Sequence, residues 1–231
     1  MNSKNPAIVS NSEINIVSKP SGRYVLWMAA KLHRKNDPDA VRSRLLDCAA
    51  RLIVDHGLSV LTLESVAREA GVSKGGLLHH YPAKDTLISG LFDQVVEWFD
   101  SRVEAALEPD EAIPARFSRA YLRVIANIDM SVPEEKRLAV LILMLSSDPQ
   151  CCVQWNSWVD ARLRQHYQTD MMPLARTLRL AADGLWLSDL GGGPDSHPST
   201  RSDILRFLEE LDAAHTSPDL KADAKPDNGE Q

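Results

Sequence analysis

The stretch from Thr62 to Tyr81, TLESVAREAGVSKGGLLHHY, most constrains what this chain can fold into. Apolar residues recur at helical spacing behind Thr62, a residue type that caps helix N-termini. Gly71 stands where a helix can end in the left-handed conformation that glycine adopts at little cost. Ser73 can cap a second, short helix, and Gly75 lies in its first turn. The spacing therefore predicts a helix–turn–helix, the motif that places a recognition helix in the DNA major groove.

The alternative is an ordinary helical hairpin with a glycine turn. Gly75 and Gly76 disfavour it, because each glycine costs a helix about 0.8–1.0 kcal/mol relative to alanine. Two glycines in a short helix indicate that close approach of its backbone to a phosphate is useful there.

Residues Arg42 to Leu91 also resemble the N-terminal DNA-binding domain of TetR-family transcriptional regulators. The matching residues are Leu45-Leu46-Asp47-Cys48-Ala49-Ala50, His56-Gly57, Thr62, Val66-Ala67, Ala70-Gly71-Val72-Ser73-Lys74-Gly75, Leu77 and Tyr81-Pro82-Ala83-Lys84-Asp85-Thr86-Leu87. Two residues depart from the family pattern: Leu78 replaces a frequent Tyr that contacts the DNA backbone, and Ala83 replaces a frequent Ser or Asn that caps the next helix. The resemblance implies a homodimer that binds a palindromic double-stranded operator, most often as a repressor, and is released by a small-molecule effector.

The helix–turn–helix and its flanks supply the candidate DNA contacts. On phosphates we expect Arg42, Thr62, Lys74, Tyr81 and Lys84. Facing the groove we expect Gly75, Leu77, His79 and His80, with Ser73 capping the helix that carries them. Phosphate contacts position the protein and base contacts specify the sequence.

The net charge of −6 is distributed unevenly along the chain. Residues 1–90 hold 12 Lys and Arg against 8 Asp and Glu, whereas residues 91–231 hold 14 against 24. DNA phosphates respond to charge within a Debye length, about 10 Å, and not to the net charge. A basic N-terminal part and an acidic remainder therefore fit a protein that binds DNA through its N-terminal part.

The pattern after the helix–turn–helix is helical without strand-like alternation, so we expect an all-α protein of about nine helices. Four segments follow: a flexible basic extension (1–37), the DNA-binding domain (38–90), an effector-binding and dimerisation domain (91–215) and a disordered tail (216–231). The extension is either a solvated tail or an arm that contacts DNA. The expected helices are Pro38–His56, two within Thr62–Tyr81, Lys84–Leu107, Ala115–Asp129, Glu134–Ser147, Gln150–Thr169, Met172–Ser188 and Thr200–Ala214. The apolar run Leu138–Leu145 covers nearly the whole circumference of its helix and predicts a central buried helix.

The last two helices carry apolar residues on more than one face and so need more than one packing partner. The candidate dimerisation residues are Leu174, Leu178, Ala181, Leu185, Ile204, Leu208 and Leu211. A two-fold four-helix bundle would bury them. The alternative is that they are buried within one chain.

The core of the second domain is the expected effector site, because apolar and aromatic lining with few polar groups is typical of small-molecule pockets. The candidate lining residues are Trp98, Tyr121, Met144, Trp155, Trp158, Asp183 and Trp186. The alternative interpretation is that these residues belong to an ordinary hydrophobic core, in which the same residue types are common.

No enzyme, cofactor or metal site is expected. The chain lacks HExxH and CxxC patterns, and Gly191-Gly192-Gly193 follows a helix as a linker and not as a phosphate loop. Three cysteines without zinc spacing, and no apolar run of about 18 residues, predict a reduced cytoplasmic protein that does not span a membrane. The remaining alternative is a helical ligand-binding or protein-adaptor module without sequence-specific DNA binding, which leaves the charge asymmetry and the two glycines unexplained.

Overall fold

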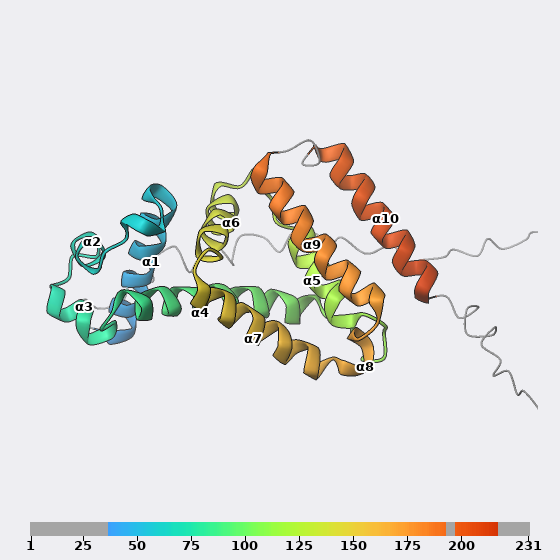
Figure 1. The fold of residues 1–231 in the computed structure, drawn as a ribbon, viewed down its shortest axis with the longest axis horizontal. Coiled ribbons are helices and arrows are strands. Elements are labelled where there is room, and N and C mark those ends of the chain that lie inside the picture. The colour runs from blue at the N-terminus through green and yellow to red at the C-terminus, as the bar shows by residue number, and fades with distance from the viewer. Residues whose placement is uncertain (1–36, 193–196, 217–231) are drawn as a thin grey trace, which may run out of the picture.

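The computed structural model describes residues 37–192 and 197–216, and over these ranges the protein is helical with no strand (Figure 1). Its helices are α1 (Pro38–His56), α2 (Leu63–Glu69), α3 (Lys74–His80), α4 (Lys84–Ala106), α5 (Arg116–Ala126), α6 (Pro133–Leu145), α7 (Pro149–Gln165), α8 (Tyr167–Asp170), α9 (Pro173–Gly191) and α10 (Pro198–Thr216). A short 3₁₀ turn, Leu58–Val60, follows α1. Within the described ranges, no single helix is both long and apolar enough to cross a membrane.

Helix boundaries in the N-terminal part follow from local capping. The Asp37 side chain accepts a hydrogen bond from Asp39 N, and Gly57 ends α1 at a φ of +90°. Thr62 Oγ1 accepts from Ser65 N at 3.1 Å, and Ser65 Oγ in turn accepts from Thr62 N at 3.2 Å, so two backbone donors are satisfied reciprocally. Each of these contacts joins residues two to four positions apart in the chain. These helix boundaries could therefore be predicted from the sequence alone.

The all-α prediction is confirmed, with ten helices in the described residues where about nine were expected. The additional element arises because the expected helix Gln150–Thr169 is divided: α7 ends at Gln165 and α8 follows after His166. The break turns Thr169 and Asp170 toward α5, where Ala115 N donates to Thr169 O at 2.7 Å. The predicted extension and tail lie, apart from their residues nearest the folded part, outside the described residues.

Two apolar cores share the long helix α4. The first joins α1–α3 and the N-terminal half of α4 to α6, through residues such as Leu45, Leu91 and Leu141. The second joins the C-terminal half of α4 to α5, α9 and α10, through residues such as Phe99 and Leu178. Figure 1 shows α4 running from the end of the molecule that holds α2 and α3 into the second core. A change in its direction would therefore move one core relative to the other.

The prediction that α6 is the central buried helix is wrong. Its Leu138, Leu141 and Leu145 are buried, but Leu143 is 40% exposed, so one face of α6 packs and the other meets solvent. The central helix is α5, which is surrounded by α4, α8 and α9. Apolar content alone did not distinguish the two, because a surface helix can also carry a continuous apolar run.

Candidate nucleic-acid interface and regulatory core

The turn between α2 and α3 has the geometry that the helix–turn–helix prediction requires. Gly71 adopts a φ of +65°, which an L side chain rarely tolerates. Val72 N then donates to Ala67 O at 3.0 Å, closing the turn. Ser73 Oγ accepts from Gly76 N at 3.1 Å and so caps α3. The second helix is therefore held at a fixed angle by backbone and cap bonds.

The residues Gly71-x-Ser73-x-Gly75 match the nucleophile-elbow pattern GxSxG of α/β-hydrolases, which the expectation of no enzyme site overlooked. That pattern needs a strand before the serine and a helix after it. Here α2 precedes the serine, and Ser73 Oγ is engaged as a helix cap. The match is therefore limited to the order of residue types and does not extend to the structure.

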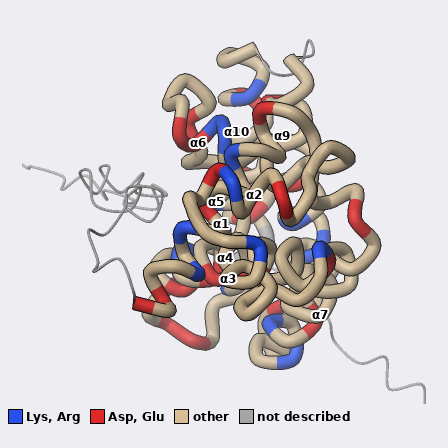
Figure 2. Tube along the Cα trace, turned by 90° about the vertical axis from the view of Figure 1, so that its left-hand side faces the viewer, with Lys and Arg blue, Asp and Glu red and all other residues tan. Residues whose placement is uncertain are grey.

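One face of α3 is open to solvent. Ser73, Lys74, Gly75 and His79 are exposed. No atom lies within 4 Å of the position where a Cβ would be placed on Gly75, so a DNA backbone could approach that turn closely. Figure 2 looks onto this end of the molecule, with α2 and α3 toward the viewer.

Two of the expected DNA contacts are corrected by their burial. Leu77 is 0% exposed and packs in the first core, so its side chain cannot face the groove. Tyr81 is 3% exposed and packs against Gly90 of α4, where an added Cβ would lie 3.0 Å from the ring. Residues four apart share a helix face, so a core-facing Leu77 places Tyr81 inward too. On the opposite face, the exposed neighbour is Leu78, which the sequence interpretation treated only as a departure from the family pattern.

Tyr81 instead holds Arg42 of α1. Arg42 Nε donates to Tyr81 Oη at 3.0 Å, and the guanidinium lies 5.5 Å from the ring centroid. Arg42 is itself exposed, so its remaining N–H groups face outward. The tyrosine therefore orients a cation and makes no outward contact of its own.

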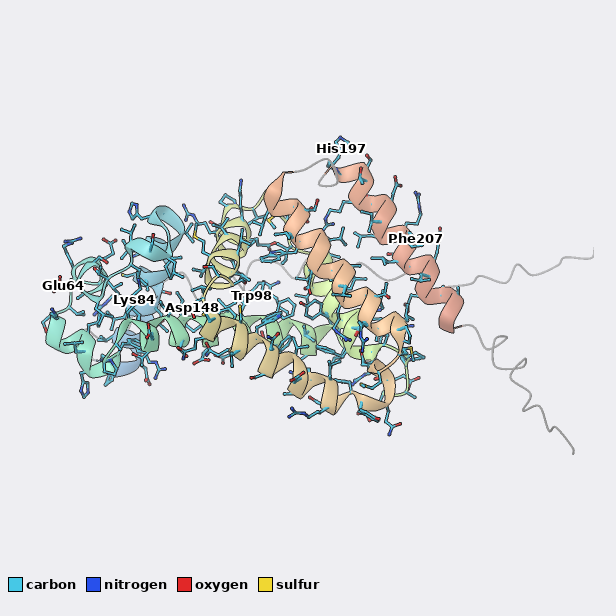
Figure 3. The ribbon with its side chains drawn as sticks, in the orientation of Figure 1. Glu64, Lys84, Trp98, Asp148, His197 and Phe207 are labelled. Carbon is cyan, nitrogen blue, oxygen red and sulfur yellow. The ribbon has the colours of Figure 1, made fainter. Side chains whose placement is uncertain are left out.

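The remaining expected phosphate contacts differ in the partners that their polar groups already have within the protein. Thr62 is exposed, and its hydroxyl caps α2. Lys74 Nζ is paired with Glu64 Oε1 at 2.6 Å on the surface, whereas Lys84 Nζ donates to Leu58 O at 3.1 Å. Figure 3 shows Glu64 and Lys84 at the same end of the molecule. Of the two histidines, His79 is exposed and His80 is half-buried.

The basic surplus of the N-terminal part does not lie in the described helices. Residues 37–90 hold six Lys and Arg against seven Asp and Glu. The surplus comes from residues 1–36, with six against one, which are outside the described residues. The folded DNA-binding domain is thus close to neutral overall, and the placement of individual cations matters more than its total charge.

Three of the expected effector residues meet in one cluster of rings in the second core. Trp155 and Trp158 lie 4.9 Å apart between centroids, and Phe99 lies 5.4 and 5.5 Å from them. Tyr121 completes the group at 5.1 Å from Phe99 and 6.3 Å from Trp155. We call Phe99, Phe117, Tyr121, Trp155 and Trp158 the aromatic cluster.

The other expected effector residues are placed around this cluster in different ways. Tyr121 Oη donates to Asp183 Oδ1 at 2.5 Å, and burial raises the pKa of the Asp183 carboxyl despite this bond and the nearby Arg179 charge. Trp186 packs on the second core, and its Nε1 is buried without a hydrogen-bond partner. Trp98 contacts both cores, and Arg102 lies over its ring at 4.2 Å from the centroid. Met144 packs only on the first core, apart from the others.

The expected dimerisation residues lie mostly inside the single chain. Leu174, Leu178 and Leu185 are buried against the second core, as is Leu208, while Ala181, Ile204 and Leu211 are partly buried there. The large apolar residues that α9 and α10 leave exposed are Leu180, Leu187 and Phe207. The four buried leucines are therefore occupied within the single chain, whereas Ala181, Ile204 and Leu211 remain partly accessible.

A buried carboxylate that no local signal marked anchors the start of α5. Asp170 accepts from Phe117 N at 3.1 Å, from Ser118 N at 2.9 Å and from the hydroxyls of Ser118 and Thr169. Arg179 Nη1 lies 3.9 Å from the same carboxylate. Asp170 thus caps a helix more than fifty residues earlier in the chain. In the parts of the chain that the structure describes, no group of His, Cys, Asp and Glu could hold a metal ion.

Comparisons with known proteins agree with this architecture. Residues 45–91 match the family "Bacterial regulatory proteins, tetR family", and residues 115–213 match "Tetracyclin repressor-like, C-terminal domain". The HTH-type transcriptional regulator BetI of Burkholderia thailandensis is 30% identical over 179 residues, which cover 66% of this chain and 84% of that protein. The HTH-type transcriptional repressor KstR2 of Mycolicibacterium smegmatis is 26% identical over 132 residues, covering 54% of this chain and 64% of that relative's length. Among solved structures, the multidrug binding protein EbrR complexed with imidazole aligns with a TM-score of 0.56 at 22% identity, over 80% of this chain and 95% of that one.

Proposed function

Because this chain belongs to the TetR family of bacterial regulators, we propose that it binds a palindromic operator as a homodimer and is released by a small-molecule effector. It is a DNA-binding transcriptional regulator, and the relatives named as repressors favour repression. Its partner is chromosomal DNA, so its place is the bacterial cytoplasm. The family is regulatory, and the chain has no enzymatic role in this proposal.

The observation that carries the proposal is the open face of α3. The exposed Gly75 and the Ser73 cap leave the first turn of α3 free for a phosphate, while Lys74 and Arg42 supply charge on either side. Arg42 keeps its expected role as a phosphate contact and is oriented by Tyr81, which loses its own. Leu78 replaces Leu77 beside His79 on the groove-facing side. Lys84 contacts phosphate only if it leaves the Leu58 carbonyl.

A single short recognition helix gives little affinity, which favours a dimer. Leu180, Leu187 and Phe207 form an exposed apolar set on α9 and α10, and a two-fold bundle of these helices with their copies would bury them. The two recognition helices would then meet successive major grooves, about 34–36 Å apart.

The effector site belongs in the second domain, around the aromatic cluster. Closely packed rings beside a carboxylate and an indole N–H without a partner offer a planar ligand both contact area and hydrogen bonds. EbrR, a structural relative named a multidrug binding protein, has been crystallised with imidazole. We therefore expect an aromatic or other planar effector.

The test is selection of bound duplexes from a random pool, followed by sequencing. We expect an enriched palindrome whose half-sites are about one helical turn apart. A pool without any enriched sequence would remove operator binding from the proposal.

A further inference from the structure

Helices α4 and α7 are joined by polar contacts that we call the α4–α7 clamp: Asp100 and Glu104 on α4, Trp158 and Arg162 on α7. Trp158 Nε1 donates to Asp100 Oδ1 at 2.6 Å, and Arg162 Nε donates to the same oxygen at 2.7 Å. Arg162 Nη1 also donates to Glu104 Oε2 at 2.9 Å. One carboxylate of α4 therefore binds two residues of α7 at once.

The clamp is largely shielded from water on its cationic side. The Arg162 side chain is only 12% exposed. Burial by itself lowers the pKa of Arg162, but the hydrogen bonds and charges of Asp100 and Glu104 outweigh it, so the pKa is raised. Leaving a shielded cation without its partners is costly, so Arg162 favours the arrangement in which Asp100 and Glu104 stay beside it.

Trp158 belongs to the clamp and to the aromatic cluster at the same time. Its ring lies 4.9 Å from Trp155, 5.5 Å from Phe99 and 5.9 Å from Phe117, measured between centroids. The indole cannot move within the cluster without stretching its bond to Asp100. Any ligand that displaces this ring therefore acts on α4 directly.

Helix α4 connects the clamp to the DNA-binding domain. It begins at Lys84, directly after α3, and Leu87 and Leu91 pack in the first core. At 1.5 Å per residue, Asp100 lies about 24 Å further along the helix. A second contact lies nearer the DNA-binding end, where Gln154 Nε2 donates to Ser89 Oγ at 2.9 Å and Asp93 Oδ1 at 2.8 Å. Loosening the clamp removes a polar restraint from the C-terminal half of α4, which then depends on the packing of residues such as Phe99, while the Gln154 bonds still hold the half nearer the first core.

We propose that Trp158 is the positioning residue through which the effector site sets the direction of α4. Displacing its indole removes one donor from Asp100, loosens the α4–α7 clamp and lets α4 tilt with the DNA-binding domain attached. This inference rests on the proposed function, because it takes the homodimer and its operator as given.

The test compares Trp158→Phe, which keeps an aromatic ring but removes the N–H donor, with Tyr167→Phe, which removes the O–H donor of an exposed ring outside the clamp and the aromatic cluster. Each protein is titrated with the selected palindrome and with a duplex that carries one half-site. The clamp sets where two recognition helices stand relative to each other, so Trp158→Phe should weaken palindrome binding about five- to tenfold, in the lower range of coupling effects. The half-site affinity of Trp158→Phe should stay within about twofold of the wild-type value, because no coupling between half-sites is involved. Both affinities of Tyr167→Phe should also stay within about twofold.

Arg162→Met breaks the other half of the clamp and should give the same signature, which keeps the test valid if Trp158→Phe folds poorly. Equal losses on palindrome and half-site would mean general destabilisation and would overturn the inference, as would unchanged palindrome affinity in both variants. A wild-type chain that selects no palindrome would overturn the proposed function itself, so the two failures are distinguishable.

Discussion

The DNA-binding domain and the second domain satisfy their polar groups over very different distances along the chain. In the first, Thr62 bonds Ser65 and Ser73 bonds Gly76, each three residues away. In the second, Asp170 bonds Ser118 across 52 residues, and Arg119 bonds Asp212 across 93. The first domain can therefore be interpreted from local sequence, while the second is specified only when its helices pack.

Substituting one cap of each kind would test this difference most directly. Asp170→Ala leaves two backbone donors of α5 and the Ser118 hydroxyl without their acceptor in a buried site. We expect a loss of about 3–5 kcal/mol in the free energy of unfolding, as for a broken buried charge network. Thr62→Ala removes a local cap of α2 in the first domain and should cost about 1 kcal/mol. Urea unfolding at one protein concentration measures both, and equal losses would contradict the distinction.

The exposed face of α9 and α10 tests whether the second domain is completed by a partner. Phe207→Glu places a charge where the proposed interface is apolar, and Tyr167→Glu is a matched control on α8, since both residues are 61% exposed. Burying an unpaired charge is costly, so Phe207→Glu should weaken dimerisation about 100-fold or more. Sedimentation velocity over a concentration series gives the result. A variant that remains dimeric would place the interface elsewhere.

Asp47 of α1 is an exception to the local pattern, because its Oδ1 is buried without a hydrogen-bond partner. Burial raises the pKa of this carboxyl to about 6, although the Arg51 charge opposes the rise. The folded pKa exceeds the unfolded value, so its contribution is fully present below about pH 4 and is lost as the pH rises through about 6.

Asp47→Asn should therefore raise the free energy of unfolding at pH 7 by about 1 kcal/mol, a value discounted for the partial exposure of the group. It should also flatten the stability profile between about pH 4 and 6. Thermal unfolding across this range measures the effect, with exposed Asp55→Asn as control. If Asp47→Asn leaves the pH profile as steep as in the wild type, another group is responsible.

The smallest expected effect concerns the surface of the recognition helix. Glu64 holds Lys74 at 2.6 Å in an exposed pair and competes with DNA phosphate for it. Glu64→Gln should raise operator affinity about two- to fivefold, because Lys74 no longer exchanges a weak surface ion pair for DNA phosphate. Glu69→Gln removes the same charge from α2 but from a carboxylate that pairs with Arg51. Fluorescence anisotropy compares them, and an equal gain in both would indicate only a general charge effect.

The sequence predicted the helix–turn–helix, its caps and the all-α class because each depends on residues within one or two turns. It misassigned Leu77, although its spacing of four from Tyr81 was available as a signal that both face inward. It had no means of finding the Asp170 cap, because nothing near Thr169 and Asp170 indicates a partner fifty residues earlier.

By itself, then, the sequence determined that this chain carries a DNA-reading motif followed by a bundle of helices, since periodicity and capping are short-range properties of the backbone. Only the tertiary structure decided which apolar faces are buried within the chain. It turned Leu178 of α9 inward and left Phe207 of α10 outside, and it placed Trp158 against Asp100. These outcomes depend on the offsets between packed helices, which no local pattern contains.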